Sequence, residues 1–214
     1  MSEVADVLYR RLEPEDQARA DFYALLARLF SDAPDAKLLA GIGRAASLSP
    51  AKSSDATIDV GSQLAAAWDA LRAASAMEDA EAASSEYQAM FVGVGRSEVS
   101  LYGSHYLGPQ SGRPLAEVRA ALAELGLARR PDSSEFEDHF AVLLEAMRML
   151  VAGDGERPPA EIARQHAFFK SHVAPWAFDC CTAIAQSPVA NYYRRVAQFA
   201  GCFLALERDS LAMD

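Results

Sequence analysis

A short run of acidic side chains beside a histidine is the feature of this sequence best suited to chemistry. Glu135, Glu137, Asp138 and His139 all fall within residues 135–139. Carboxylates bind guanidinium and ammonium groups through charge-assisted hydrogen bonds, and a histidine titrates near neutral pH. Two interpretations are open: the carboxylates cap and solvate the start of a helix, or they form a receptor for a cationic group whose strength His139 tunes.

The helix start is predicted from the residues around this run. Ser134 and Glu137 have the S-x-x-E spacing of a capping box. Behind them, apolar side chains recur at helical spacing: Phe136, Phe140, Leu143, Leu144 and Met147. We therefore expect a helix to begin at Ser134, with the acidic residues in its first turn, where the helix dipole favours negative charge.

A second candidate group lies in a glycine-dense segment, residues 93–114, which is expected to be a long connection. Within it, the sequence Y-G-S-H-Y at residues 102–106 supplies Tyr102, Ser104, His105 and Tyr106. Aromatic residues in a loop either cover a core or form a recognition surface, and the sequence leaves both interpretations open.

Enzymatic and metal-binding motifs are missing from the sequence. It contains no H-E-x-x-H, G-x-S-x-G or P-loop pattern. His166 and His172 are six residues apart, which places them on opposite faces of a helix. The cysteines Cys180, Cys181 and Cys202 fit neither a disulfide framework nor a C-x-x-C zinc site. We therefore predict no catalytic residue, no metal and no cofactor.

Composition narrows the class of partner. The chain has 214 residues, of which 51% are hydrophobic, which suits one compact domain. Its formal charge of -10 disfavours nucleic acid and favours basic partners. Uncharged stretches such as residues 180–193 are too short to span a bilayer, and residues 1–17 lack the pattern of a secretory signal. A cytoplasmic location without membrane insertion is expected.

Helices are the elements that must position these side chains. Apolar residues at helical spacing predict helices over 17–30 and 35–46, an Ala-rich helix containing Trp68, and others over 114–126 and 192–206. A helix marked by Ile162 is expected to end or kink at Pro175, and a further helix is expected to run to Gln186. A further helix is expected to lead through Tyr87 and Phe91. No stretch alternates as a strand would, so the predicted fold is all-α and globular.

Several of these motifs together resemble one protein family. They are the E-x-x-D-H sequence of residues 135–139 before an apolar helix, the aromatic segments at 87–91, 102–106 and 168–176, and the pattern at 190–201. In their order and spacing, from about residue 21 to 206, they are similar to the TorD/DmsD/NarJ family of redox enzyme maturation chaperones. Phe136 stands where family members often carry proline.

The resemblance implies a fold and a function. It implies a TorD-like chaperone fold in a single domain over 1–214, with an N-terminal lobe over about 1–125, a hinge over about 126–134 and a C-terminal lobe over about 135–214. It also implies a cytoplasmic chaperone rather than an enzyme. Such a chaperone binds the twin-arginine signal peptide or the apo catalytic subunit of a molybdopterin oxidoreductase, holding it for cofactor insertion before export.

The two candidate groups then form one expected client site. Glu135, Glu137 and Asp138, with His139, are expected to meet the paired arginines of the leader. The residues expected to border a groove for its apolar stretch are Tyr102, Ser104, His105 and Tyr106. The alternatives are a guanine-nucleotide-binding or hydrolysing protein and a non-selective helical adaptor. Monomer, homodimer and domain-swapped forms all remain open.

Overall fold

The computed structural model describes residues 12–48, 60–93, 97–108, 113–127 and 135–213. Over these ranges the chain is helical, and its one β feature is an isolated bridge between Tyr102 and His139. The all-α prediction is confirmed. None of the described helices is long and apolar enough to cross a membrane.

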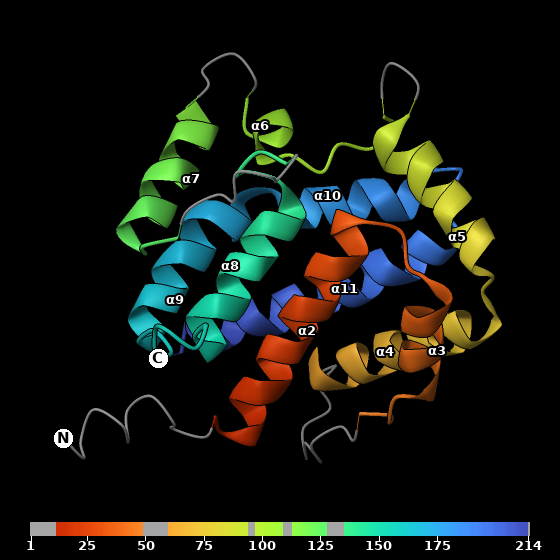
Figure 1. Cartoon of the computed structure of the whole chain (residues 1–214), viewed down its shortest axis with the longest axis horizontal. Helices are drawn as coiled ribbons and strands as arrows, with labels where there is room; N and C mark the ends of the chain where they lie inside the picture. The colour runs from red at the N-terminus through yellow and green to blue at the C-terminus, as the bar shows by residue number, and fades with distance from the viewer. Residues whose placement is uncertain (1–11, 49–59, 94–96, 109–112, 128–134, 214) are drawn as a thin grey trace.

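Long helices from both ends of the chain build the core (Figure 1). Helix α2 (Pro14–Ser31) packs along α8 (Phe140–Ala152), and α11 (Tyr192–Leu211) packs against α4 (Val60–Met77) and α10 (Ala174–Gln186). The remaining elements are α3 (Ala36–Arg44), α5 (Ala80–Tyr87), α6 (Gly103–Tyr106), α7 (Arg113–Glu124), α9 (Ile162–Phe168) and the π-helical turns η1 (Gln88–Val92) and η2 (Phe169–Val173). Helices before and after residues 126–134 therefore share one core; the domain and lobe boundaries stay predictions, and residues 128–134 lie outside the described part.

Helix α2 is central to this core because it is buried on two sides. It begins with Pro14 in its first turn, which suits the fixed φ of proline. On one side Phe22 makes edge-to-face contacts with the rings of Trp68, at 5.4 Å between centroids, and Phe199, at 5.1 Å. On the other side Phe30 packs against Phe140 of α8, at 4.8 Å. This packing fixes the α2 face that lies beside α8.

A buried ion pair also orients α2. Glu207 of α11 is 2% exposed and accepts hydrogen bonds from Arg19 Nε at 2.8 Å and from the Tyr23 hydroxyl at 2.9 Å. Arg19 also donates to the side-chain oxygen of Gln165 on α9, at 3.0 Å. Because a buried charge must be paired and hydrogen-bonded, this network links three helices in one arrangement.

The predicted start of the helix behind the acidic run is wrong. Helix α8 begins at Phe140, and its N-cap is His139, whose Nδ1 accepts the backbone N–H of Ala141 at 3.2 Å. Glu137 lies in a turn before the helix, and the exposed Phe136 is not part of the buried stripe; Ser134 lies outside the described residues. The physical reason is the bridge to Tyr102, which holds His139 in an extended conformation and so delays the helix.

The segment over 93–114 also differs from a simple connection. Residues Gly103–Tyr106 form the short helix α6, and α7 already begins at Arg113. Gly103 allows α6 to approach the indole of Trp176 closely, since a Cβ at that position would lie 2.9 Å from Nε1. The helices predicted over 17–30, 35–46 and 114–126 and around Trp68 are confirmed by α2, α3, α7 and α4.

Candidate functional site

The two candidate groups of the sequence lie against each other in the structure. The backbone N–H of Gly103 donates to the carbonyl of Asp138 at 2.9 Å, and the N–H of Phe140 donates to the carbonyl of Leu101 at 2.8 Å. The side chain of Asp138 accepts the N–H of Ser104 at 2.9 Å. Residues 101–104 and 135–140 therefore form one hydrogen-bonded unit between α6 and α8.

Asp138 and His139 are structural members of this unit. They are 2% and 4% exposed, and each accepts a backbone N–H at the start of a helix. Burial lowers the pKa of His139, which favours the neutral ring with Nδ1 as an acceptor. The opposite nitrogen, Nε2, then faces a carboxylate oxygen of Glu135 at 3.8 Å. The sequence-predicted pair thus fixes the backbone that carries Glu135 and Glu137.

Tyr102 connects the unit to Glu135. Its hydroxyl donates to Glu135 Oε2, and its ring packs edge-on against His139 at 4.9 Å between centroids. Burial and the bonded carboxylate raise the pKa of Tyr102, so it remains a neutral donor. Glu135 is held in place while staying partly exposed.

The other residues of the 102–106 group have different surroundings. The Tyr106 hydroxyl donates to the carbonyl of Ser100 at 2.9 Å, and its ring stacks on Trp176 at 5.6 Å. His105 is exposed and packs against the edge of Tyr106, while Ser104 contributes its backbone N–H to Asp138. Of these side chains Tyr106 docks α6 on α10, and none of the three lines the pocket that Glu135 borders.

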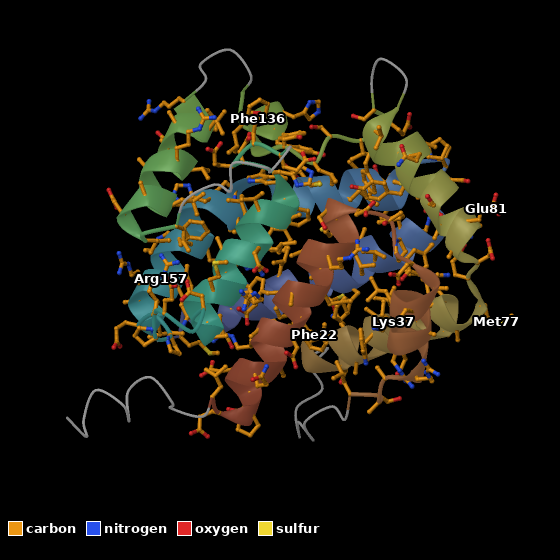
Figure 2. The ribbon with its side chains drawn as sticks, viewed as in Figure 1. Phe22, Lys37, Met77, Glu81, Phe136 and Arg157 are labelled. Carbon is orange, nitrogen blue, oxygen red and sulfur yellow. The ribbon has the colours of Figure 1, made fainter. Side chains whose placement is uncertain are left out.

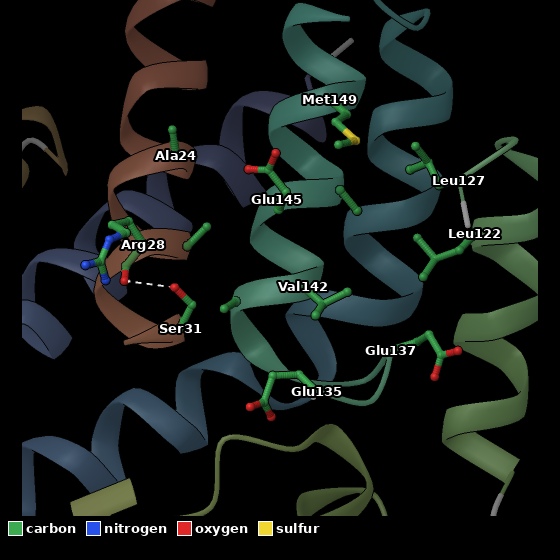
Figure 3. A pocket seen from close by; sticks show the side chains of 13 residues that line it. Ala24, Arg28, Ser31, Leu122, Leu127, Glu135, Glu137, Val142, Glu145 and Met149 are labelled. Atoms are coloured by element: carbon green, nitrogen blue, oxygen red, sulfur yellow. Dashed lines mark hydrogen bonds between the residues drawn. The ribbon is translucent and has the colours of Figure 1, made fainter. Parts of the chain in front are cut away.

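That pocket lies between α2, α7 and α8 and has a volume of about 520 Å³. Figure 3 shows its floor on α8 with α2 on one side and α7 on the other. It is lined by Ala24, Ala27, Arg28, Ser31, Leu122, Leu127, Glu135, Glu137, Ala141, Val142, Glu145, Ala146 and Met149. Alanines lie on the facing sides of α2 and α8, so this part of the lining consists of small apolar side chains.

Three carboxylates, those of Glu135, Glu137 and Glu145, line this otherwise largely apolar pocket. The Glu145 side chain lies on the side of α8 that faces α2, and both of its carboxylate oxygens accept a hydrogen bond from Arg148 Nε at 2.9 Å. Glu137 lies beside α7. The lining cation, Arg28, turns its guanidinium away from α8 and donates to the carbonyls of Asp32 and Ala33 at the end of α2. An apolar segment that carries a positive charge is the ligand chemistry that this arrangement suits.

Sequence reasoning found Glu135 and Glu137 and missed the rest of the pocket. Ala24, Ala27 and Ala146 look like ordinary helix residues in the sequence, and Glu145 looks like a solvent-exposed helix position. Helical spacing places Val142, Glu145 and Met149 on one face of α8, but only the packing of α2 and α7 makes that face a pocket.

The described residues supply no metal-binding group of three or more His, Cys, Asp or Glu side chains. The thiols of Cys180 and Cys181 are buried, and burial raises the pKa of Cys180 to about 12 and that of Cys181 well above its usual range. Both are protonated near neutral pH, and they act as small apolar packing residues of α10.

Comparison with known proteins adds a family. The chain matches the family model described as nitrate reductase delta subunit over residues 59–182, which is more than half of its length. The matched region begins just before α4, includes both hydrogen-bonded segments of the candidate site, and ends within α10. A search of curated proteins found no match.

Proposed function

Because this chain belongs to the nitrate reductase delta subunit family, we propose that it is the chaperone of one molybdopterin oxidoreductase and binds its apo catalytic subunit before export. The family is one of molybdoenzyme maturation chaperones, which interact with the catalytic subunits of these enzymes. The resemblance to the TorD/DmsD/NarJ family is thereby confirmed. The client is held in the cytoplasm until its cofactor is inserted.

The pocket between α2, α7 and α8 is the proposed binding site for the N-terminal leader of that client. The observation that carries this proposal is the combination of an apolar floor with three carboxylates in one cavity. A twin-arginine leader is basic at its start and apolar behind, so its two parts match the two kinds of lining. A pocket of about 520 Å³ holds a few side chains, which suits one turn of a bound leader.

The acidic and the apolar lining residues then have different roles. Glu135, Glu137 and Glu145 attract the arginines, while Leu122, Leu127 and Met149 contact the apolar side chains. Asp138 and His139 act indirectly, because they hold in place the backbone segment that carries Glu135 and Glu137. This division replaces the expectation that Asp138 meets an arginine directly, since its carboxylate is buried against Ser104.

A peptide titration tests the proposal. A fluorescent peptide with the leader sequence of the catalytic subunit is titrated with the full chain, and binding is followed by anisotropy. We expect binding that weakens as salt rises, because screening reduces the attraction between exposed charges. Replacing the paired arginines of the peptide by glutamine should weaken binding; equal affinity for both peptides would favour the non-selective adaptor.

A matched pair of methionine variants locates the site. Met149→Ala removes part of the pocket lining and should weaken the peptide affinity. Met77→Ala truncates the same side chain at a position that is 88% exposed and lies on the far side of the molecule from α7 (Figure 2). It should leave the affinity unchanged. Equal effects of the two variants, or no binding by the unaltered chain, would count against the pocket.

A further inference from the structure

One carboxylate of the pocket is already paired with a cation from another helix. Glu137 Oε2 accepts Nε of Arg119 on α7 at 3.0 Å. The Glu137 side chain is 14% exposed, so this pair is partly shielded from water, although the Arg119 side chain is 49% exposed. Glu145, by contrast, forms an ion pair with Arg148 of its own helix, and Glu135 accepts a hydrogen bond from the neutral hydroxyl of Tyr102.

The pair also attaches α7 to the unit that carries the acidic rim. Helix α7 buries Val118 and Leu122, and Leu122 lines the pocket. The end of α7 is held separately: Arg157 donates to the carbonyls of Leu125, at 3.2 Å, and Gly126, and Arg164 donates to that of Glu124, at 2.9 Å. The middle of α7 is therefore joined to Glu137 at the pocket rim through Arg119. Its C-terminal end is held by Arg157 and Arg164.

We propose that Arg119 limits the affinity of the pocket for a cationic client by competing with the guanidinium of the client for Glu137. This inference rests on the proposed function of the pocket. A client arginine that approaches Glu137 replaces or shares an existing ion pair, so it gains less than it would at a vacant carboxylate. A neutral client segment gains nothing from Glu137. Arg119 thus moderates the hold on a cationic leader, which the chaperone must later release.

The test is a gain of affinity. In Arg119→Gln, the twin-arginine peptide should bind about threefold to tenfold more tightly, as expected for the loss of a competing, partly exposed ion pair. Arg113→Gln is the matched control: it makes the same charge change on the same helix, where Arg113 pairs with Glu117 at 2.7 Å and is 79% exposed. Its affinity should stay close to that of the unaltered chain, so any difference between the two variants is local.

Two further arms identify the mechanism. The gain should vanish for the peptide whose paired arginines are replaced by glutamine, and it should vanish when Arg119→Gln is combined with Glu137→Gln. Arg119→Lys keeps the charge and should return the affinity toward that of the unaltered chain. Far-UV circular dichroism confirms that each variant keeps its helices.

The outcomes separate the two proposals. If the unaltered chain binds the twin-arginine peptide and Arg119→Gln binds no more tightly than Arg113→Gln, the competition is refuted while the client site stands. If neither the unaltered chain nor any variant binds either peptide, both proposals fail. A tighter hold in Arg119→Gln that is equal for the arginine and glutamine peptides would mean that α7 restricts entry by bulk, and it would overturn the charge competition.

Discussion

The carboxylate of Asp138 accepts the backbone N–H of Ser104 at 2.9 Å, across 34 positions of the sequence. This bond joins the acidic run to the aromatic segment, and it places a buried negative charge at the start of α6. The E-x-x-D-H sequence therefore has a structural role in this chain. The partly exposed side chains of Glu135 and Glu137 reach the pocket because the buried Asp138 and His139 fix the backbone that carries them.

Removing the Asp138 carboxylate should destabilise the chain. In Asp138→Ala the partly buried N–H of Ser104 loses its acceptor, at an expected cost of about 1–3 kcal/mol in the free energy of unfolding. Asp138→Asn keeps an acceptor oxygen and should cost less. Urea denaturation followed by circular dichroism measures both. Unchanged stability of Asp138→Ala together with weaker peptide binding would instead make Asp138 a direct ligand of the client.

Acidification should weaken the N-cap of α8. Burial lowers the pKa of His139 in the folded chain, whereas the unfolded chain titrates near the ordinary value of about 6.5. The unfolded state therefore binds the proton more readily, so stability is complete above about pH 6.5 and falls as the pH decreases below it. Protonation also places a hydrogen on Nδ1, which then cannot accept the Ala141 N–H.

Urea midpoints between roughly pH 8 and pH 5 test this dependence. His139→Asn retains a cap acceptor and removes the titration, so its stability should fall less on acidification. Burial also lowers the pKa of the half-buried His172, so the stability of His139→Asn should still decline on acidification, but less than that of the unaltered chain. The exposed His105→Asn is the control, with the slope of the unaltered chain. An unaltered slope in His139→Asn would contradict the role of His139.

The helices that the sequence predicted well are those specified by local pattern. Apolar spacing alone locates α2 and α4, and proline and glycine mark the two ends of α7; Gly126 adopts a φ of 70° just beyond it. The start of α8 was mispredicted because a local capping box competes there with a long-range bridge. Nothing near His139 in the sequence indicates that Tyr102 holds it extended.

The pocket was beyond sequence reasoning for a different reason. Its lining comes together only when α2 and α7 lie beside α8, and residues such as Ala24, Ala27 and Ala146 give no sign of this in the sequence. A small residue on a helix face predicts close packing as readily as a cavity, and the choice depends on the facing helix. The charged members Glu135 and Glu137 were found because carboxylates carry a chemical signal of their own.

A methyl group at Gly103 should disturb the contact between α6 and α10. A Cβ there would lie 2.9 Å from Trp176 Nε1 and 3.0 Å from Cε2, within the indole ring system. Gly103→Ala should therefore lower the free energy of unfolding by about 1–3 kcal/mol, as overpacking does. Tryptophan emission during denaturation reports the change. Gly41→Ala, on α3 with no atom within 4 Å of its Cβ, is the control and should stabilise by about 0.5–1 kcal/mol. A neutral Gly103→Ala would show that the indole shifts freely.

Loss of the Glu207 carboxylate should be the more severe of two ion-pair deletions on α11. Glu207→Gln removes the buried counter-charge of Arg19, whose remaining ion pair is with the 43% exposed Asp16, and it disturbs the bond to Tyr23. Breaking a buried pair by removing one partner costs about 3 kcal/mol or more. Asp209→Asn removes a carboxylate that is 49% exposed and pairs with Arg208, and it should change stability by less than about 0.5 kcal/mol. Urea denaturation of both variants decides the point. Because water replaces the lost partner at the exposed site but has little access to Glu207, equal effects would mean that the α2–α11 contact opens to solvent in the folded chain.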